Sequence, residues 1–309
     1  MINLYDKFCK INREIVDYQN IIESDGVIKA YYGISSEGKF RISFLSNKPS
    51  GINGMTRSIN IVQGHSSENN YWTCFDLIND DFLSVFCSFG EDLIECILHE
   101  KNEFRALSLL RSRFNTWLAL FRKSRTPLSL EKAKGLYGEL YFIKYYMIDK
   151  YGINNAILSW SGPDGYHKDF AIDDTWYEIK TISSGASIVK ISSIQQLESE
   201  QTGKLVLMRV EEMADTYAVK DSCIIDLINS IISQFTENYI KDKFLEKLAK
   251  LGFDFCDDLS FKKYQLSKIE KYIVNNDFPI IKESDIKSQA INNISYELII
   301  KLIQKYQEE

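Results

Sequence analysis

The sequence has few of the side chains that most often bind transition metals. It contains 3 histidines and 6 cysteines, and no two cysteines are spaced as C-x-x-C. Cys96 and His99 are the only cysteine and histidine at ligand spacing, and no second pair completes a site. This pattern argues against a zinc centre and favours free thiols in a reducing compartment.

Long apolar runs, a secretion signal and an excess of positive charge are also missing. No stretch approaches the roughly 20 apolar residues that cross a membrane, and residues 1–7 lack a basic segment followed by an apolar one. We therefore expect a cytoplasmic protein with no membrane partner. Because 37 basic residues stand against 43 acidic ones, the net charge is −6. Any binding of nucleic acid must then depend on local basic patches.

Proline and glycine are too sparse to mark linkers. The chain has 4 prolines and 15 glycines, with no internal repeat or low-complexity tract. Its 309 residues predict about two domains. We expect an N-terminal α+β domain of unknown role over residues 1–100, a core with a leading helix over 101–215, and an α-rich extension over 216–309 packed on that core.

What the sequence does contain is a predicted β-hairpin that pairs two acids. Two strand-like runs flank Asp173-Asp174, which is a typical turn pair. A two-residue or a four-residue loop at this place sets Asp169 opposite Glu178. The two predicted strands are Lys168–Ile172 and Thr175–Ile182.

One face of this hairpin carries the polar side chains. Because side chains alternate along a strand, Asp169, Glu178 and Lys180 share that face. The other face is apolar and is expected to be core: Phe170, Ile172, Tyr177 and Ile179. Two directly opposed carboxylates repel each other unless a cation lies between them. The hairpin therefore predicts a divalent-metal site.

The motif Glu-x-Lys by itself is weak. The same chain has Glu37-Gly38-Lys39 in a predicted hairpin turn, and cross-strand charges on an exposed strand are common. The opposed Asp169, the apolar reverse face and an upstream Glu139 favour the metal site here.

Glu139 lies in a helix that is predicted from the N-cap candidate Ser129 to about Met147. It falls on or beside the apolar stripe of this helix, where a carboxylate is costly unless it is paired or metal-bound. The alternative is an ion pair with a nearby lysine or arginine. Gly135 and Gly138 each weaken a helix, and their spacing suits close approach of another backbone, for which the hairpin is the candidate.

The remaining chain predicts a mixed α/β fold. Strands are expected in the first domain at Val27–Ile34, Phe40–Leu45, Ser58–Val62 and Tyr71–Ile78, followed by helices from Asp80 or Asp81 and over Glu103–Lys123. After the hairpin we expect a strand at Ile188–Ile191 that extends the sheet or connects it, a crossover helix from Ser193 to Ser199 and a buried strand at Lys204–Val210. Asp221–Leu251 is helical in pattern, Phe261–Val274 is strand-like, and Ile294–Ile300 is a strand or the start of a helix to Gln307.

The hairpin resembles the active site of the PD-(D/E)xK nuclease superfamily, in which an Asp on one strand precedes (D/E)-x-K on the next. Asp169 and Glu178-Ile179-Lys180 carry this resemblance, and Glu139 matches an additional acid that many of these nucleases place in the preceding helix. More narrowly, the chain resembles a bacterial family of PD-(D/E)xK motif proteins found beside restriction and phage-defence genes. The segments that carry this narrower resemblance are Gly135–Leu140, Ser192–Leu197, Asp277–Pro279 and Ile294–Leu298.

The resemblance implies a restriction-endonuclease-like core of the order helix-strand-strand-strand-helix-strand and a set of site residues. Asp169, Glu178 and the backbone carbonyl of Ile179 would bind Mg²⁺, for which Mn²⁺ could substitute. Lys180 would position or help to deprotonate the attacking water and stabilise the charge of the transition state. Glu139 would orient the cluster or help to hold a second metal. Secondary candidates are Asp164, which is the literal Pro-Asp aspartate, and Gln195.

The implied function is Mg²⁺-dependent cleavage of DNA by an endonuclease in restriction or phage defence. Double-stranded DNA, other subunits of a defence complex or a second copy of the chain are the expected partners. Two alternatives stay open: a catalytically silent binding or scaffold subunit, and an RNA-cleaving nuclease or toxin.

A basic stretch leads into the predicted core. Between residues 101 and 125 the sequence has seven basic residues and one acidic residue, Glu103. These basic residues form either a solvated helix face or a surface that contacts phosphates. The candidates for nucleic-acid contact are Arg111, Arg113, Arg122, Lys123 and Arg125.

Overall fold

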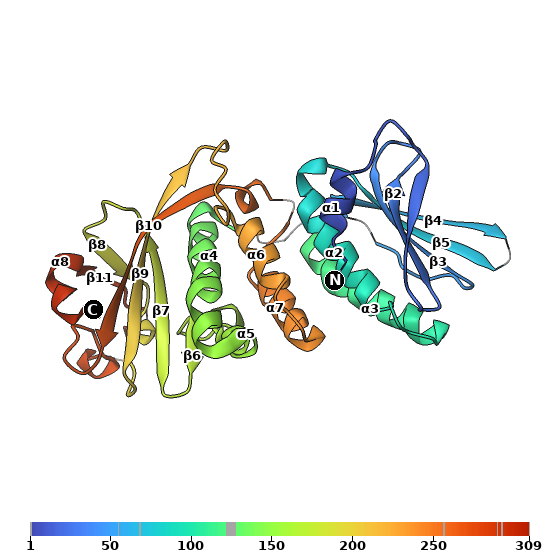
Figure 1. Cartoon of the computed structure of the whole chain (residues 1–309). Coiled ribbons are helices and arrows are strands. Elements are labelled where there is room, and N and C mark those ends of the chain that lie inside the picture. Colours follow the sequence, from blue (N-terminus) through green and yellow to red (C-terminus); the bar gives the residue numbers. More distant parts are fainter. Residues whose placement is uncertain are drawn as a thin grey trace. The chain divides into compact units, whose positions relative to one another are not determined.

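The chain forms two compact units in a computed structural model (Figure 1). The structure describes residues 2–54, 56–67, 69–121, 128–255, 257–288, 290–291 and 293–308. Unit 1 comprises residues 1–127 and 252–257, and unit 2 comprises 128–251 and 258–309. Within the described residues, no helix combines the length and apolar character needed to cross a bilayer.

Unit 1 contains a five-stranded antiparallel sheet of order β1-β2-β3-β5-β4. The predicted pairing of β2 with β3 is confirmed, whereas β1 and α1 were not predicted. The strands are β1 Tyr18–Ile22, β2 Lys29–Ile34, β3 Phe40–Ser46, β4 Ile59–Ser67 and β5 Asn70–Leu77, and the helices are α1 Leu4–Cys9, α2 Leu83–Glu95 and α3 Glu103–Phe121.

The long helix α3 belongs to unit 1, so the expected boundary at residue 100 does not match the units. Its apolar stripe packs on the sheet of unit 1 together with α2. The ring of Phe75 in β5 lies 5.6 Å from Phe114 in α3 and 5.3 Å from Phe89 in α2. Burial of these rings ties α3 to this sheet.

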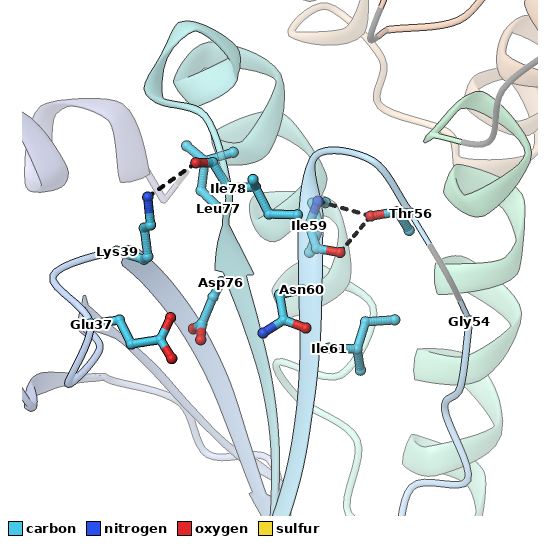
Figure 2. A pocket seen from close by; sticks show the side chains of 10 residues that line it. All are labelled: Glu37, Lys39, Gly54, Thr56, Ile59, Asn60, Ile61, Asp76, Leu77 and Ile78. Carbon is cyan, nitrogen blue, oxygen red and sulfur yellow. Dashed lines mark hydrogen bonds between the residues drawn. The ribbon is translucent and has the colours of Figure 1, made fainter.

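A surface hollow of about 310 Å³ lies beside the β2–β3 turn of unit 1 (Figure 2). Glu37 and Lys39 line it, so the second Glu-x-Lys of the chain sits in a hairpin turn, as predicted. Lys39 Nζ donates a hydrogen bond of 3.2 Å to the carbonyl of Ile78, and the αL backbone of Gly38 (φ +75°) closes the turn. The motif therefore occurs here in an unrelated setting.

Unit 2 is built on a four-stranded mixed sheet of order β10-β9-β7-β6. β7 pairs antiparallel with β6 and parallel with β9, and β10 pairs antiparallel with β9. A separate two-stranded sheet joins β8 and β11. The strands are β6 Phe170–Ile172, β7 Thr175–Ile182, β8 Ile188–Ile191, β9 Gly203–Met213, β10 Lys263–Val274 and β11 Tyr296–Ile299.

The C-terminal third is not the α-rich extension that we expected. It contains α6 Ile224–Ile232, α7 Asn238–Lys250 and α8 Ile300–Ile303, but it also supplies β10, which pairs with β9 over 11 positions. The expected boundary at residue 215 is therefore wrong, because β10 completes the main sheet.

The helix that begins at Ser129 is longer than predicted. The Ser129 side chain accepts a hydrogen bond from the backbone N–H of Lys132, which confirms the N-cap. α4 covers Leu130–Phe142, a π-helical turn covers Ile143–Met147, and α5 follows over Ile148–Ser159 with a break at Gly152 (φ +77°). The π-helical turn ends at Met147, where the helix was predicted to end, and α5 continues the helical path beyond it.

The crossover from β7 to β9 contains one 3₁₀ turn, Ile194–Gln196, where we expected a helix. Strand β8 also lies in this crossover and pairs with β11, so it does not extend the main sheet. Apolar side chains of the crossover still cover one face of that sheet. They form one cluster with strand residues: Trp176, Val189, Ile191, Leu197, Leu205 and Leu207.

Both faces of the predicted hairpin are buried, although only one was expected to be core. Phe142 of α4 lies 5.6 Å from Phe170 and 5.4 Å from Tyr177 on the expected apolar face. On the other face Trp176 is 2% exposed and Glu178 is 1% exposed. Glu178 is therefore a buried carboxylate in a covered sheet.

Gly138 of α4 lies so close to Thr181 of β7 that a side chain at this position would collide with it. A Cβ there would lie 2.2 Å from Thr181 Oγ1, whereas a Cβ at Gly135 would meet nothing within 4 Å. Gly138→Ala should reduce the free energy of unfolding by about 1–3 kcal/mol. Gly135→Ala, the matched control in the same helix, should be neutral or add up to about 1 kcal/mol. Urea denaturation of both variants tests the pair, and equal effects would contradict the contact.

Candidate active site

The hairpin register places Asp169 beside Glu178, as the sequence predicts. Ala171 pairs with Trp176 and Phe170 with Tyr177, so the next position up the hairpin brings Asp169 level with Glu178. β6 itself begins only at Phe170. Asp169 Oδ2 accepts a hydrogen bond of 2.7 Å from the backbone N–H of Ile179, so its carboxylate lies against β7.

Glu178 has one partnered and one unpartnered carboxylate oxygen. Its Oε1 lies 2.8 Å from Lys180 Nζ. Its Oε2 is buried and has no hydrogen-bond partner in the described part of the chain. A buried carboxylate oxygen without a partner is unfavourable, so this atom is the clearest sign of a missing ligand.

Glu139 approaches from α4 and is held by a tryptophan. Trp160 Nε1 donates a hydrogen bond of 2.6 Å to Glu139 Oε2. The partner of this carboxylate oxygen is therefore an indole, where the alternative prediction was a lysine or arginine beside the apolar stripe of the helix. Sequence reasoning missed Trp160, although it stands nine residues before Asp169 in the same motif stretch.

Gly162 keeps the space between Asp169 and Glu139 open. A Cβ at this position would lie 3.1 Å from Asp169 Oδ1 and 3.7 Å from Glu139 Oε2. Both carboxylates therefore border the same small volume. A glycine leaves this volume free for a ligand.

Lys180 joins the hairpin to the crossover. Its Nζ donates to Gln196 Oε1 at 3.0 Å as well as to Glu178, and Gln196 Oε1 also accepts from the N–H of Ser192 at 2.8 Å. Of the neighbouring glutamines Gln195 and Gln196, the sequence favoured Gln195 as the candidate, but the structure joins Gln195 to Lys168 Nζ through its backbone carbonyl at 2.7 Å. The glutamine side chain of the site is that of Gln196.

Asp164 lies outside this cluster. Its two carboxylate oxygens each lie 2.6 Å from a lysine of α7, Lys247 and Lys250. These ammonium groups lower the pKa of Asp164. The literal Pro-Asp aspartate thus anchors a loop to α7, and Asp169 occupies the site.

A family model with the description "Putative PD-(D/E)XK family member, (DUF4420)" matches residues 10–301. The chain belongs to this family. The resemblance seen in the sequence is confirmed, and membership indicates a nuclease-like function that acts on nucleic acid. No curated protein and no solved structure matches the chain.

Burial raises the pKa of all three acids of the site, and the charge of Asp169 raises the pKa of Glu178 and of Glu139 further. Burial and then the charge of Asp169 raise the pKa of Glu178 to about 8. Burial, followed by the charge of Asp169, raises the pKa of Glu139 well above its usual range. Burial likewise raises the pKa of Asp169, although the N–H of Ile179 and the charge of Lys180 oppose it. The cluster therefore needs positive charge to be fully ionised.

PD-(D/E)XK nucleases generally use divalent metals, and the residues of this site fit such an ion. The donors are hard oxygens, which suit Mg²⁺, and Glu178 Oε2 is a buried acceptor without a partner. Among the described residues, no group of three or more His, Cys, Asp and Glu side chains is arranged around a metal position. The side-chain candidates to hold such an ion are Asp169 and Glu178, whose positions lie level on the hairpin.

Of the five candidates for nucleic-acid contact, the structure describes two, both in α3. Arg113 is buried, with its Nε 3.5 Å from Asp92 Oδ2, which is incompatible with contact to a phosphate backbone. Arg111 Nε donates to the carbonyl of Leu107 within its own helix. The other three candidates lie outside the described residues: Arg122, Lys123 and Arg125.

Removing the charge of Asp169 should stabilise the metal-free protein. Asp169→Asn keeps an oxygen for the N–H of Ile179 but removes repulsion with Glu178, so the free energy of unfolding in EDTA should rise by roughly 1 kcal/mol. The stabilisation by Mg²⁺ should fall at the same time. Thermal melts in EDTA and in Mg²⁺ measure both effects. Asp164→Asn is the matched control, because it loses its lysine pairs and should lower stability equally in both conditions.

The stability of the metal-free protein should depend on the titration of Glu178. Its raised pKa means that the folded state holds a proton that the unfolded state releases, so stability falls as the pH rises from 4.5 to about 8. Glu178→Gln removes this titration. The stability of the variant relative to wild type should increase steadily across that interval in urea melts with EDTA. A constant difference would show that Glu178 is not desolvated in solution.

Proposed function

We propose that this protein is a metal-dependent phosphodiesterase, specifically a DNA endonuclease that acts in restriction or phage defence. One observation carries the proposal: Asp169, Glu178 and Lys180 converge on one face of β7, and a buried Glu178 oxygen there has no partner among the described residues. Family membership supports the nuclease-like chemistry.

Asp169 and Glu178 would hold Mg²⁺ or Mn²⁺, which when bound lowers the pKa of water and neutralises charge on the phosphate. The protein's own residues define the geometry around that position. The N–H of Ile179 fixes one oxygen of Asp169, which leaves Asp169 Oδ1 directed towards Gly162 and the space shared with Glu139.

Lys180 would position the attacking water and stabilise the negative charge that develops on the phosphate. Gln196 and Glu178 both accept from its Nζ, so the ammonium is held at a defined position in a covered site. A fixed positive charge in such a site stabilises a transition state more than the same charge does in water.

Glu139 would complete the site from the opposite side. The indole of Trp160 holds its Oε2, and burial together with the charge of Asp169 raises the pKa of Glu139 and so favours its protonated form when no metal is bound. This carboxyl could therefore orient a water or take up a proton during the reaction. Trp160 is a positioning residue in this scheme.

Lys180→Gln should abolish cleavage without loss of the metal. We expect the rate of Mg²⁺-dependent cleavage to fall by about 10²-fold or more, while Mg²⁺ still raises the melting temperature. Lys190→Gln is the control, because Lys190 is an exposed lysine on β8. Cleavage of labelled double-stranded DNA and of RNA is assayed in parallel.

The outcomes separate the alternatives. Cleavage of RNA but not of DNA would transfer the same site to an RNA nuclease or toxin. A protein that Mg²⁺ neither stabilises nor activates would be a silent binding subunit, and the proposal would fail.

A further inference from the structure

A second cluster of charged and aromatic side chains lies on the other face of β7. Tyr177 neighbours Glu178 in the strand, so its side chain points to the opposite face. Two further phenols and three lysines gather around Tyr177, from the π-helical turn, α5, β9 and β10. The members of this Tyr–Lys cluster are Tyr146, Lys150, Tyr151, Tyr177, Lys204 and Lys271.

Direct contacts hold the cluster together. Tyr177 Oη lies 2.8 Å from Tyr151 Oη and accepts from Lys150 Nζ at 3.1 Å. Lys271 Nζ lies 3.7 Å from the ring centre of Tyr146, and Lys150 Nζ lies 5.5 Å from the same ring. The rings fix the ammonium groups without neutralising them.

Among the described residues that these contacts join, the lysines outnumber the carboxylates. An acidic side chain, Glu308, reaches the cluster and forms an ion pair with Lys204, and its backbone N–H donates to the carbonyl of Lys271 at 2.8 Å. Lys204 first, and then Lys271 and Lys150, lower the pKa of Glu308. One carboxylate thus faces three ammonium groups.

The lysines also act on the phenol of Tyr146. Burial acts to raise its pKa, but the hydrogen bond with Tyr177 and then the charges of Lys271 and Lys150 lower it. Burial raises the pKa of its partner Tyr177, so the pKa shifts of the two phenols have opposite signs and the contacts of the lysines carry the argument.

We propose that the Tyr–Lys cluster is a binding site for a phosphate group of a nucleic-acid backbone, and that Glu308 occupies part of it in the free protein. Lys150 and Lys271 supply positive charge, and Tyr146 and Tyr151 supply hydroxyl donors and ring edges. Lysines interleaved with aromatic side chains are typical of surfaces that follow a nucleic-acid strand.

The phosphate site follows from the cluster alone, whereas the nucleic-acid ligand rests on the proposed function. The two are tested with different probes. Inorganic phosphate probes the site, and a short DNA duplex in EDTA probes nucleic-acid binding without cleavage. Failure of cleavage would therefore leave this proposal standing, and failure of the phosphate probe would leave the active site standing.

The variants are Lys150→Gln/Lys271→Gln and, in the opposite direction, Glu308→Gln. Phosphate should perturb the tyrosine ultraviolet spectrum of the wild type and not that of the double lysine variant. The slope of log affinity for DNA against log salt should decrease by about 1 in the double variant. Glu308→Gln removes the internal anion and should tighten the binding of both probes, a gain that misfolding cannot produce.

Lys243→Gln is the matched control, because Lys243 also lies over a tyrosine ring, at 5.7 Å from that of Tyr239, but pairs with Glu246. It should leave the phosphate response unchanged. A double variant that behaves like wild type and Lys243→Gln with both probes would overturn the proposal. A phosphate response that is lost in the double variant, with an unchanged salt slope, would overturn the assignment to nucleic acid.

Discussion

The burial of Glu178 in a sheet covered on both faces is the constraint on which the site depends. A lone carboxylate at 1% exposure is unfavourable, and Asp169 beside it adds repulsion. Lys180 neutralises part of this charge, but it serves only one oxygen of Glu178. The neighbouring groups then act to hold the acids close to one another, through the N–H of Ile179 and the indole of Trp160.

Lys168, which lies next to Asp169 in the sequence, fixes the loop that carries Gln196. Lys168 Nζ donates to the carbonyls of Gln195, Gln196 and Glu198 at 2.7–3.0 Å and lies 3.9 Å from the ring centre of Trp176. These hydrogen bonds hold the 3₁₀ turn that contains Gln196 against the hairpin. They fix the position of this segment in the absence of the crossover helix that was predicted there. Lys168 is half-buried, and this burial lowers its pKa to about 8.

The sequence predicted the local geometry of the site better than its surroundings. Alternation and the Asp173-Asp174 turn define the hairpin register within a few residues, so the level positions of Asp169 and Glu178 could be derived. The indole on Glu139 and the role of Gln196 depend on contacts between segments 16 or more residues apart, which no local pattern records. The edge strand β10 was recognised as strand-like, but its pairing with β9 was not, because β10 follows two helices.

The alternation of β7 explains how one strand supports two opposite electrostatic environments. Glu178 and Lys180 face the acidic site, whereas Tyr177 between Trp176 and Glu178 turns towards lysines on the helix-covered face. The sheet separates the two sets of charges, so the lysines of the Tyr–Lys cluster cannot pair with the acids and keep their positive field. A shift of β7 by one residue would exchange the faces and bury Tyr177 among carboxylates and Glu178 among lysines and phenols. The parallel pairing of β7 with β9, in which Tyr177 is level with Lys204 and Glu178 with Leu205, fixes the register that prevents this exchange.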